Sequence, residues 1–355
     1  MARRPGLRAI PMERVSAELL KERRDQLDVY LPLRSPDVQL GIDDSLAPVP
    51  QRYRMIARVN GRFVGLRFTS TSFRQLCTLA AIPTPLLSRA PAAMGLNLLR
   101  GMLEMSEAGE GRPFLFRLRM SSRPTLRAIL PQSFVRFDDL QIVEALLRAT
   151  SGKYAKVATV NVDEDTWFTR LIVGGEIDLG TSKAPDPVAP GVDLITSETG
   201  VHPLEIRHVL LRIVCANGIT RVSDRQSTWQ SRYTSIDRHV LENRLAAALE
   251  GAFGSGRELA GRLSDSRSDY LVDPRQEIDK IFRNYRLGNP SGRVGEWIGA
   301  EVMKYSTLFG ISRWTICQAF TEVAKGLDHP QRMKFEDAMG SYLMQPDGTN
   351  RRTDH

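Results

Sequence analysis

The sequence predicts an α+β protein, in which an antiparallel sheet built from hairpins with packed helices is followed by a helical C-terminal region. Short segments before residue 234 alternate apolar and polar residues and are joined by tight-turn sequences, which is typical of β-hairpins. Segments after residue 234 instead carry apolar residues at helical spacing. The chain has 355 residues, of which 42% are hydrophobic, so it is long enough to bury a sizeable core.

Four regions are expected along the chain. In order, they are an N-terminal helix and extended linker (1–50), an α+β core (51–233), a helical domain (234–344) and a disordered tail (345–355). The first region is predicted because Val15–Tyr30 has helical apolar spacing, while Ser35–Pro50 contains several prolines.

The first hairpin is predicted at Tyr53–Phe68, where the dipeptide Asn60-Gly61 supplies the turn. One face of its first arm carries basic residues, namely Arg52, Arg54 and Arg58. A helix is expected between Thr69 and Pro83, because Thr69 and the residues after it are good N-caps. A second helix is expected at about Pro91–Met105.

A second hairpin is predicted from Phe114–Met120 and Thr125–Leu130. Strand parity places Arg117 and Arg119 on the face opposite the phenylalanines, and Arg127 of the partner strand can join them. Three arginines on an exposed sheet face would form a track for phosphates. The alternative is an ordinary solvated sheet face.

The helix that follows is expected to begin at Asp138-Asp139, whose carboxylates suit a helix N-terminus. A third hairpin, Lys156–Val162 with Thr166–Val173, has three consecutive acids at its tip, Asp163–Asp165. Acids of this kind could hold a divalent cation, but consecutive residues on a tight tip do not easily converge on one ion. We therefore expect no metal site. A crossover loop is expected at Gly180–Gly191.

The segment Asp193–Arg221 places a polar turn, Thr196–Gly200, before an apolar run, Val209–Val214. The run ends at Cys215–Gly218, where Asn217-Gly218 favours positive backbone φ. We expect a buried segment that reaches the surface at this point and turns sharply.

These two motifs resemble the paired signature of the phage/plasmid-like protein family, a domain of unknown function. The residues that match are Ser197, Glu198, Gly200, Val214, Cys215, Asn217 and Gly218. Leu126–Leu146 also resembles a block of that family, although Pro131–Phe134 stands where the family usually has Ser-Asp-x-Tyr. The likeness covers about Thr69–Phe253. It implies a protein derived from a phage or mobile element and supplies no characterised activity.

Helical spacing dominates the last third of the chain. The first helix is expected at Ile236–Phe253, and Gly251, Gly254 and Gly256 are expected to end it. Further helices are expected at about 257–263, 274–286, 292–308, 312–327 and 330–343. This region could serve as a docking bundle or as the surface of a homo-oligomer.

The net charge of +8 favours a polyanionic partner, although a basic balance can also simply keep a protein in solution. Nucleic acid is the expected partner, with DNA favoured over RNA. Besides the three sheet arginines, the candidate contacts are Arg212, Arg221, Arg225, Trp229, Arg232 and Tyr233. Single-stranded nucleic acid is bound by positive charges along its backbone and by aromatic rings that stack on its bases. The competing interpretation is a solvent loop whose Trp229 packs into the core.

Cysteine usage indicates a reducing compartment. Cys77, Cys215 and Cys317 are far apart and form no C-x-x-C motif, which disfavours a disulfide framework or a zinc site. The sequence has no apolar run of membrane-spanning length, and its first residues lack the apolar core of a secretory signal. We therefore expect a cytoplasmic protein with no membrane partner.

The predicted function is nucleic-acid binding in phage or plasmid DNA metabolism, in recombination, annealing or protection, without catalysis. The sequence lacks the motifs of phosphate loops, dinucleotide folds, zincins and nucleophile elbows, so no cofactor is expected. One alternative is a mobile-element enzyme that acts on nucleic acid through Glu198, His208 and Cys215, or through an acidic metal site. Another is an assembly protein that binds partners through its helical third.

Overall fold

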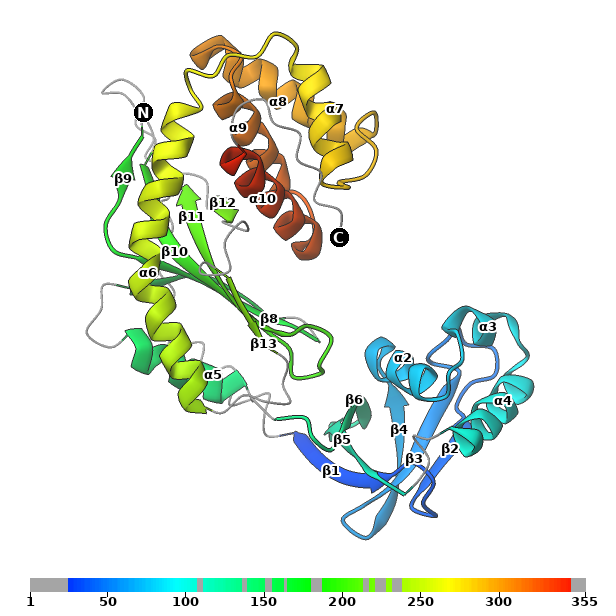
Figure 1. Ribbon diagram of the computed structural model, residues 1–355. Coiled ribbons are helices and arrows are strands. Elements are labelled where there is room, and N and C mark those ends of the chain that lie inside the picture. Colours follow the sequence, from blue (N-terminus) through cyan, green and yellow to red (C-terminus); the bar gives the residue numbers. More distant parts are fainter. Residues whose placement is uncertain are drawn as a thin grey trace.

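The computed structural model describes residues 25–106, 111–135, 139–150, 155–162, 165–179, 187–212, 217–220, 228–231 and 238–345. It confirms the α+β class: two sheets built largely from antiparallel strands are followed by a helical C-terminal region (Figure 1). The expected N-terminal helix up to residue 24 and the tail from residue 346 lie outside the described residues.

The first sheet has six strands in the order β1-β5-β6-β4-β3-β2. Their bounds are β1 Gln26–Pro32, β2 Val38–Ile42, β3 Tyr53–Val59, β4 Arg62–Phe68, β5 Pro113–Arg119 and β6 Thr125–Pro131. The two predicted hairpins, β3–β4 and β5–β6, are confirmed, and Asn60 and Gly61 take the expected positive φ of 49° and 79°. Residues 26–30, expected as the end of a helix, instead belong to the edge strand β1, so the sheet crosses the boundary predicted at residue 50.

Helices α2 (Ser70–Leu79), α3 (Thr84–Arg89) and α4 (Ala92–Met105) cover one face of this sheet (Figure 1). Thr69 caps α2 through a reciprocal capping box with Ser72, as its position predicts. The short α3 is an addition to the expected elements. The apolar sides of these helices and strands form one core, in which the thiol of Cys77 is buried.

The second sheet is centred on β10 (Pro187–Thr196) and β11 (Leu204–Arg212). Its other strands are β7 Ala155–Val162, β8 Trp167–Val173, β9 Ile177–Asp178, β12 Asn217–Thr220 and β13 Thr228–Ser231. Two expectations are wrong here. The crossover loop does not extend to Gly191, because β10 begins at Pro187, and Asn217-Gly218 is not the turn, because it begins β12 opposite Arg212.

Helices α5 (Asp139–Thr150) and α6 (Arg238–Asp265) pack against the second sheet. The expectation that glycines end α6 near residue 253 is wrong, because the helix is 28 residues long and continues to Asp265. Glycine instead lets α6 lie close to the sheet. A Cβ on Gly251 would come within 3.0 Å of the His208 ring, and one on Gly256 within 2.6 Å of Pro190.

The predicted helices after residue 270 are confirmed. They are α7 Pro274–Asn284, α8 Arg293–Phe309, α9 Arg313–Ala324 and α10 His329–Met344. They share a core with the second half of α6, and Figure 1 shows α6 and α10 on opposite sides of the second sheet. Cys317 is buried in this core, and its burial raises the pKa of the thiol to about 12. None of the described helices is long and apolar enough to cross a membrane.

Ion pairs fasten α10 to the second sheet. Arg170, Asp193 and Arg207 are neighbours across β8, β10 and β11, so positive and negative charges alternate along one row. The Arg170 guanidinium donates to Asp193 at 2.7 Å and to Glu336 of α10 at 2.6 Å. Arg207 donates to Asp337 of α10 at 2.9 Å. Each charged side chain of this row is in an ion pair, so the row attaches α10 to the second sheet.

Burial and the guanidiniums act in opposite directions on the two carboxyl groups of α10. Burial alone would raise the pKa of Glu336, but Arg170 and Arg332 outweigh it and hold that pKa below its ordinary value. At Asp337, burial outweighs Arg207 and raises the pKa to about 6.

Candidate nucleic-acid interface

The two sheets meet at the turn after β10, in which Ser197, Glu198 and Thr199 are buried. Gln75 of α2 donates to the Thr199 carbonyl at 2.8 Å, so the turn is bound to the first sheet and its helices. The hydroxyl of Thr199 donates to Asp165 at 3.0 Å, which binds the turn to the start of β8 as well. This family-like turn therefore joins the two halves of the protein.

Arg117 and Arg127 share one sheet face as expected, but the expectation that they form an exposed phosphate track is wrong. Their side chains are only 4% and 7% exposed. Nη1 of Arg127 donates to Oε2 of Glu198 at 2.9 Å. Arg117 donates to Asp28 at 3.1 Å and to the Glu198 carbonyl at 3.1 Å. Carboxylates neutralise this pair and protein covers it, so it does not face a polyanion.

The cover comes from the second sheet. Leu115, Ala128 and Leu130 share the face of Arg117 and pack into one core with β10 and β11. Leu115 has the parity of Arg117 and Arg119, so the sequence carries one apolar position that indicates burial on the supposed solvent face. Ala128 and Leu130 have the opposite parity to Arg127, and they reach this face because a register shift in the β5–β6 pairing leaves Arg127 as an extra residue.

Beyond this covered end, the same face of the first sheet is exposed, and we call this part the open face. It is formed by Arg54, Arg58, Phe63, Arg67 and Arg119, with Ile56, Gly65 and Thr125 between them. Arg54 lies opposite Arg67, which lies opposite Thr125, which lies opposite Arg119. At about 4.8 Å per strand, this row places three arginines within roughly 14 Å.

The open face keeps an excess of positive charge. The side chains of Arg54, Arg58 and Arg67 are 44%, 53% and 54% exposed. Asp43 lies 3.3 Å from Arg67 and 3.7 Å from Arg54, and Asp37 lies 3.4 Å from Arg58. Ion pairs at such exposed positions contribute little, so a phosphate can replace the aspartates as partner. Arg119, half-buried at the end of the row, adds a fourth guanidinium.

An aromatic ring lies beside these charges. Phe63 is 55% exposed and lies directly opposite Arg58 in the hairpin. The Arg58 guanidinium carbon is 5.8 Å from the centre of the Phe63 ring, a cation–π distance. The register of the predicted β3–β4 hairpin already places Arg54 opposite Arg67 and Arg58 opposite Phe63, a signal that the predicted arginine face of β3 left unused. The link from Arg67 to Arg119 instead depends on the parallel, non-local pairing of β4 with β6.

Among the described residues proposed for catalysis, Glu198 and His208 are not brought together. Both ring nitrogens of His208 are engaged by α6: Nδ1 lies 2.8 Å from the hydroxyl of Ser255, and Nε2 lies 2.9 Å from the Ala248 carbonyl. His208 pairs with Val192, so it lies roughly 13 Å along β10 from the strand's end, at about 3.3 Å per residue. Glu198 follows that end, bonded to arginine.

Glu205 and His208 do not share a face either, because the segment that holds them is a strand and not a helix. Glu205 instead pairs with Arg207 on the opposite side of the sheet from His208. Cys215 lies outside the described residues. The ion pair of Glu198 and the hydrogen bonds of His208 thus give both residues a structural role.

Of the acidic hairpin tip, only Asp165 is described, whereas Asp163 and Glu164 lie outside the described residues. The Asp165 carboxylate accepts hydrogen bonds from Thr71 at 2.6 Å and from Thr199 at 3.0 Å. Within the described part of the chain, no group of three His, Cys, Asp or Glu side chains is placed to hold a metal ion.

The remaining predicted nucleic-acid contacts lie at the end of β11 and after it in the sequence. Arg212 belongs to β11, and Trp229 belongs to β13, opposite Ile206. Their side chains lie outside the described part of the structure, as do the other members of the patch, Arg221, Arg225, Arg232 and Tyr233. The patch stays a prediction.

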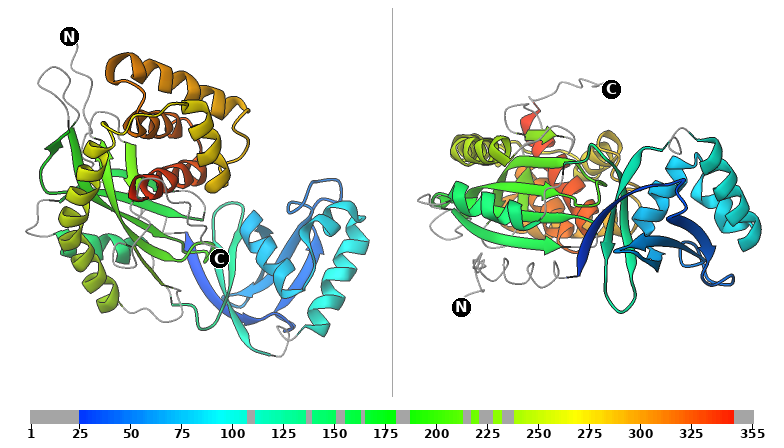
Figure 2. Two further views of the ribbon diagram at one scale, coloured as in Figure 1. Left: turned by 45° about the horizontal axis from the view of Figure 1, so that its top comes forward. Right: turned by 90° about the horizontal axis from the view of Figure 1, so that it is seen from below.

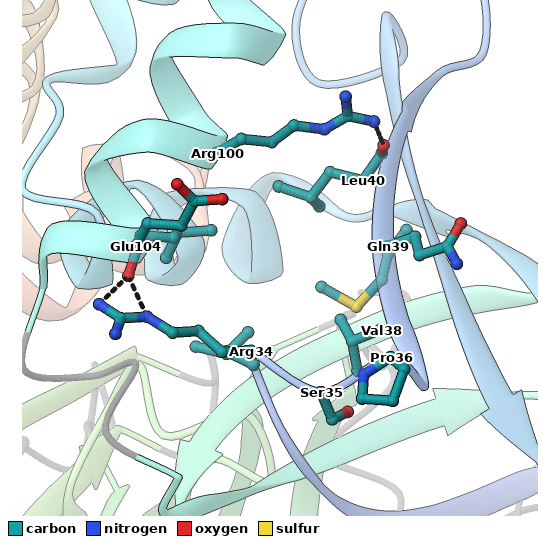
Figure 3. A pocket seen from close by; sticks show the side chains of 11 residues that line it. Arg34, Ser35, Pro36, Val38, Gln39, Leu40, Arg100 and Glu104 are labelled. Carbon is teal, nitrogen blue, oxygen red and sulfur yellow. Dashed lines mark hydrogen bonds between the residues drawn. The ribbon is translucent and has the colours of Figure 1, made fainter.

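A cavity of about 440 Å³ lies between β2 and the end of α4 (Figure 3). Its apolar lining includes Leu33, Met55 and Leu103. Arg34 donates to the Leu103 carbonyl at 2.9 Å and 3.0 Å, and Arg100 donates to the carbonyl of Leu40. Both arginines thus bind backbone carbonyls, where they stabilise the last turn of α4 and the edge strand.

Comparison of the chain with protein-family models finds no match, and searches of curated proteins and of solved structures find none either. The likeness to the phage/plasmid-like family stays a prediction that rests on the two motifs.

Proposed function

We propose that this chain is a cytoplasmic nucleic-acid-binding protein that acts in phage or plasmid DNA metabolism, in recombination, annealing or protection. The polyanion lies across the open face. The observation that carries the proposal is the row of exposed Arg54 and Arg67 and half-buried Arg119 across four strands, with Arg58 beside it. Arginines at one-strand and two-strand spacings suit successive phosphates of a nucleic-acid backbone.

The binding role does not need the covered pair. Arg117 and Arg127 bind Glu198 and Asp28 and hold the two bodies together, while the exposed arginines remain available. Division of the arginines between these roles also explains why the strands carry so many of them. Asp37 and Asp43 lower the net charge of the face. Binding should weaken as salt rises, because each phosphate that an arginine neutralises releases counterions.

The test is a titration of the full chain with fluorescently labelled DNA and RNA at several salt concentrations. Its key variant replaces Arg54, Arg67 and Arg119 together by Gln. Each lost phosphate contact lowers the slope of log K against log salt by about 0.7 for a single strand and about 0.9 for duplex DNA. We therefore expect weaker binding and a slope reduced by about 2 to 3.

The matched control removes the same charge from the helical region, by changing Arg275, Arg283 and Arg293 to Gln. These three residues are also exposed. An equal loss in both triple variants would mean that only net charge matters and would overturn the proposed site. Absence of binding by the wild type, together with a molar mass that rises with concentration, would favour the assembly alternative.

A further inference from the structure

We infer that the open face binds single-stranded nucleic acid and that an unpaired base stacks on Phe63. This inference rests on the proposed function and names its substrate class. It starts from the position of the ring: Phe63 is a large apolar side chain on a charged face, and it is 55% exposed. An exposed ring beside guanidiniums is the combination that holds unpaired bases and the backbone joining them.

The backbone beside the ring leaves room for a base. Gly65 follows Phe63 on the same face of β4, two residues along the strand, and lies directly opposite Ile56. A Cβ built on Gly65 would meet nothing within 4 Å. The glycine therefore forms a low point in the face, bordered by the Phe63 ring along the strand and by the half-buried Ile56 across it.

Charges lie on both sides of this low point. Arg67 is the next residue of β4 on the same face, and Arg58 lies opposite Phe63 at the other end. Phosphates on either side of a stacked base can reach these guanidiniums, because neighbouring same-face positions on a strand are about 6.6 Å apart. The ring, the low point and the two cations therefore make one site for a nucleotide with its flanking phosphates.

A duplex does not offer this contact, because its bases are stacked on one another and show only their edges in the grooves. An apolar ring beside an open glycine is suited to the face of a base and supplies no donor or acceptor for a base edge. The arginines alone would bind either form. Phe63 is the residue that separates single strands from duplexes.

The experiment compares the wild type with Phe63→Leu, which keeps an apolar residue and removes the ring. The probes are a labelled single-stranded DNA, its duplex, and a strand of equal length in which abasic residues replace the central bases. Stacking of a base on an aromatic side chain changes affinity by at least about 5-fold. We expect the variant to bind the single strand at least about 5-fold more weakly than the wild type, with an unchanged salt slope and unchanged duplex binding.

The abasic strand should bind wild type and variant equally, because it keeps the phosphates and lacks the bases. Leu86→Ala is the matched control, since Leu86 is a 49% exposed apolar residue on the helical side of the same sheet. If Phe63→Leu leaves single-strand binding intact, or weakens the abasic strand as much, the inference is wrong while nucleic-acid binding stands. If no probe binds the wild type, the proposed function itself is wrong.

Discussion

Nη1 of Arg127 lies 2.9 Å from Oε2 of Glu198, and this pair links β6 of the first sheet to the turn after β10 of the second. Both side chains are less than 10% exposed. A buried pair of this kind need not add net stability over an apolar pair, but removal of one partner leaves the other charge uncompensated. The pair is thus a structural link, and removal of either partner should destabilise the protein.

Glu198→Ala should lower the free energy of unfolding by about 3 to 5 kcal/mol, because it leaves the Arg127 guanidinium buried without its carboxylate. Urea unfolding measures the change. The control is Glu301→Ala, which removes the partner of the 66% exposed Lys304 at 3.1 Å and should cost about 0.5 kcal/mol or less. Comparable losses in the two variants would contradict the structural role of Glu198.

Gly200→Ala should destabilise the protein through two effects. Gly200 has φ of +73°, and a Cβ there would lie 2.9 Å from Leu130 and 3.3 Å from Phe134. Gly61→Ala isolates the first effect, since Gly61 has φ of +79° with nothing within 4 Å of a Cβ. The backbone cost is about 1 to 2 kcal/mol in both variants. Crowding should add about 1 to 3 kcal/mol at Gly200 alone, measured by urea unfolding. Equal costs in the two variants would contradict the close packing of Leu130 and Phe134 against this turn.

The link between Asp337 and Arg207 should depend on pH. The pKa of Asp337 is raised to about 6 in the folded protein, against about 3.9 in an unfolded chain. The folded state therefore binds this proton more tightly, so the stability that the proton provides is complete below pH of about 4 and is lost as pH rises through 6.

Asp337→Asn removes this titration. The free energy of unfolding of the wild type, relative to the variant, should fall as pH rises from about 4 to about 6 and then level off. Chemical unfolding of both proteins across this range provides the measurement. Glu336, whose pKa is lowered, is present in both proteins and acts with the opposite sign, since its contribution to stability is lost as pH falls. A constant difference across the range would contradict the raised pKa.

His208→Leu tests the structural role of that imidazole. The change leaves the Ser255 hydroxyl and the Ala248 carbonyl without the partners that His208 provides, 2.8 Å and 2.9 Å away. Loss of such buried hydrogen bonds costs about 1 to 3 kcal/mol, which thermal or urea unfolding detects. A variant as stable as the wild type, yet altered in its action on nucleic acid, would revive the catalytic alternative.

Local patterns were enough to predict most of the elements. Asn60-Gly61 determines its own turn because both residues accept positive φ, and Thr69 caps α2 through bonds made within four residues. The later helices follow from apolar spacing in the same way. The end of α6 was predicted wrongly, because its glycines serve close contact with His208 and Pro190, which are distant in sequence.

The candidate site was predicted only in part. Parity correctly placed Arg117 and Arg119 on one sheet face, and Arg127 joins them through the register shift in β6, but parity does not show what packs on that face. The second sheet covers two of these arginines, and the residues that bring it there are distant in sequence. The neighbours of the third, Arg67 and Arg54, depend on the parallel pairing of β4 with β6, which no local signal predicts.

The central claim is that nucleic acid contacts the open face. Ultraviolet cross-linking of the full chain to a short single-stranded DNA, followed by mass-spectrometric mapping of the linked peptides, tests it directly. The account predicts links within Tyr53–Phe68, which contains Phe63, and at the Arg119 end of β5. Links confined to the helices from Pro274 to Met344, with none in the first sheet, would contradict it.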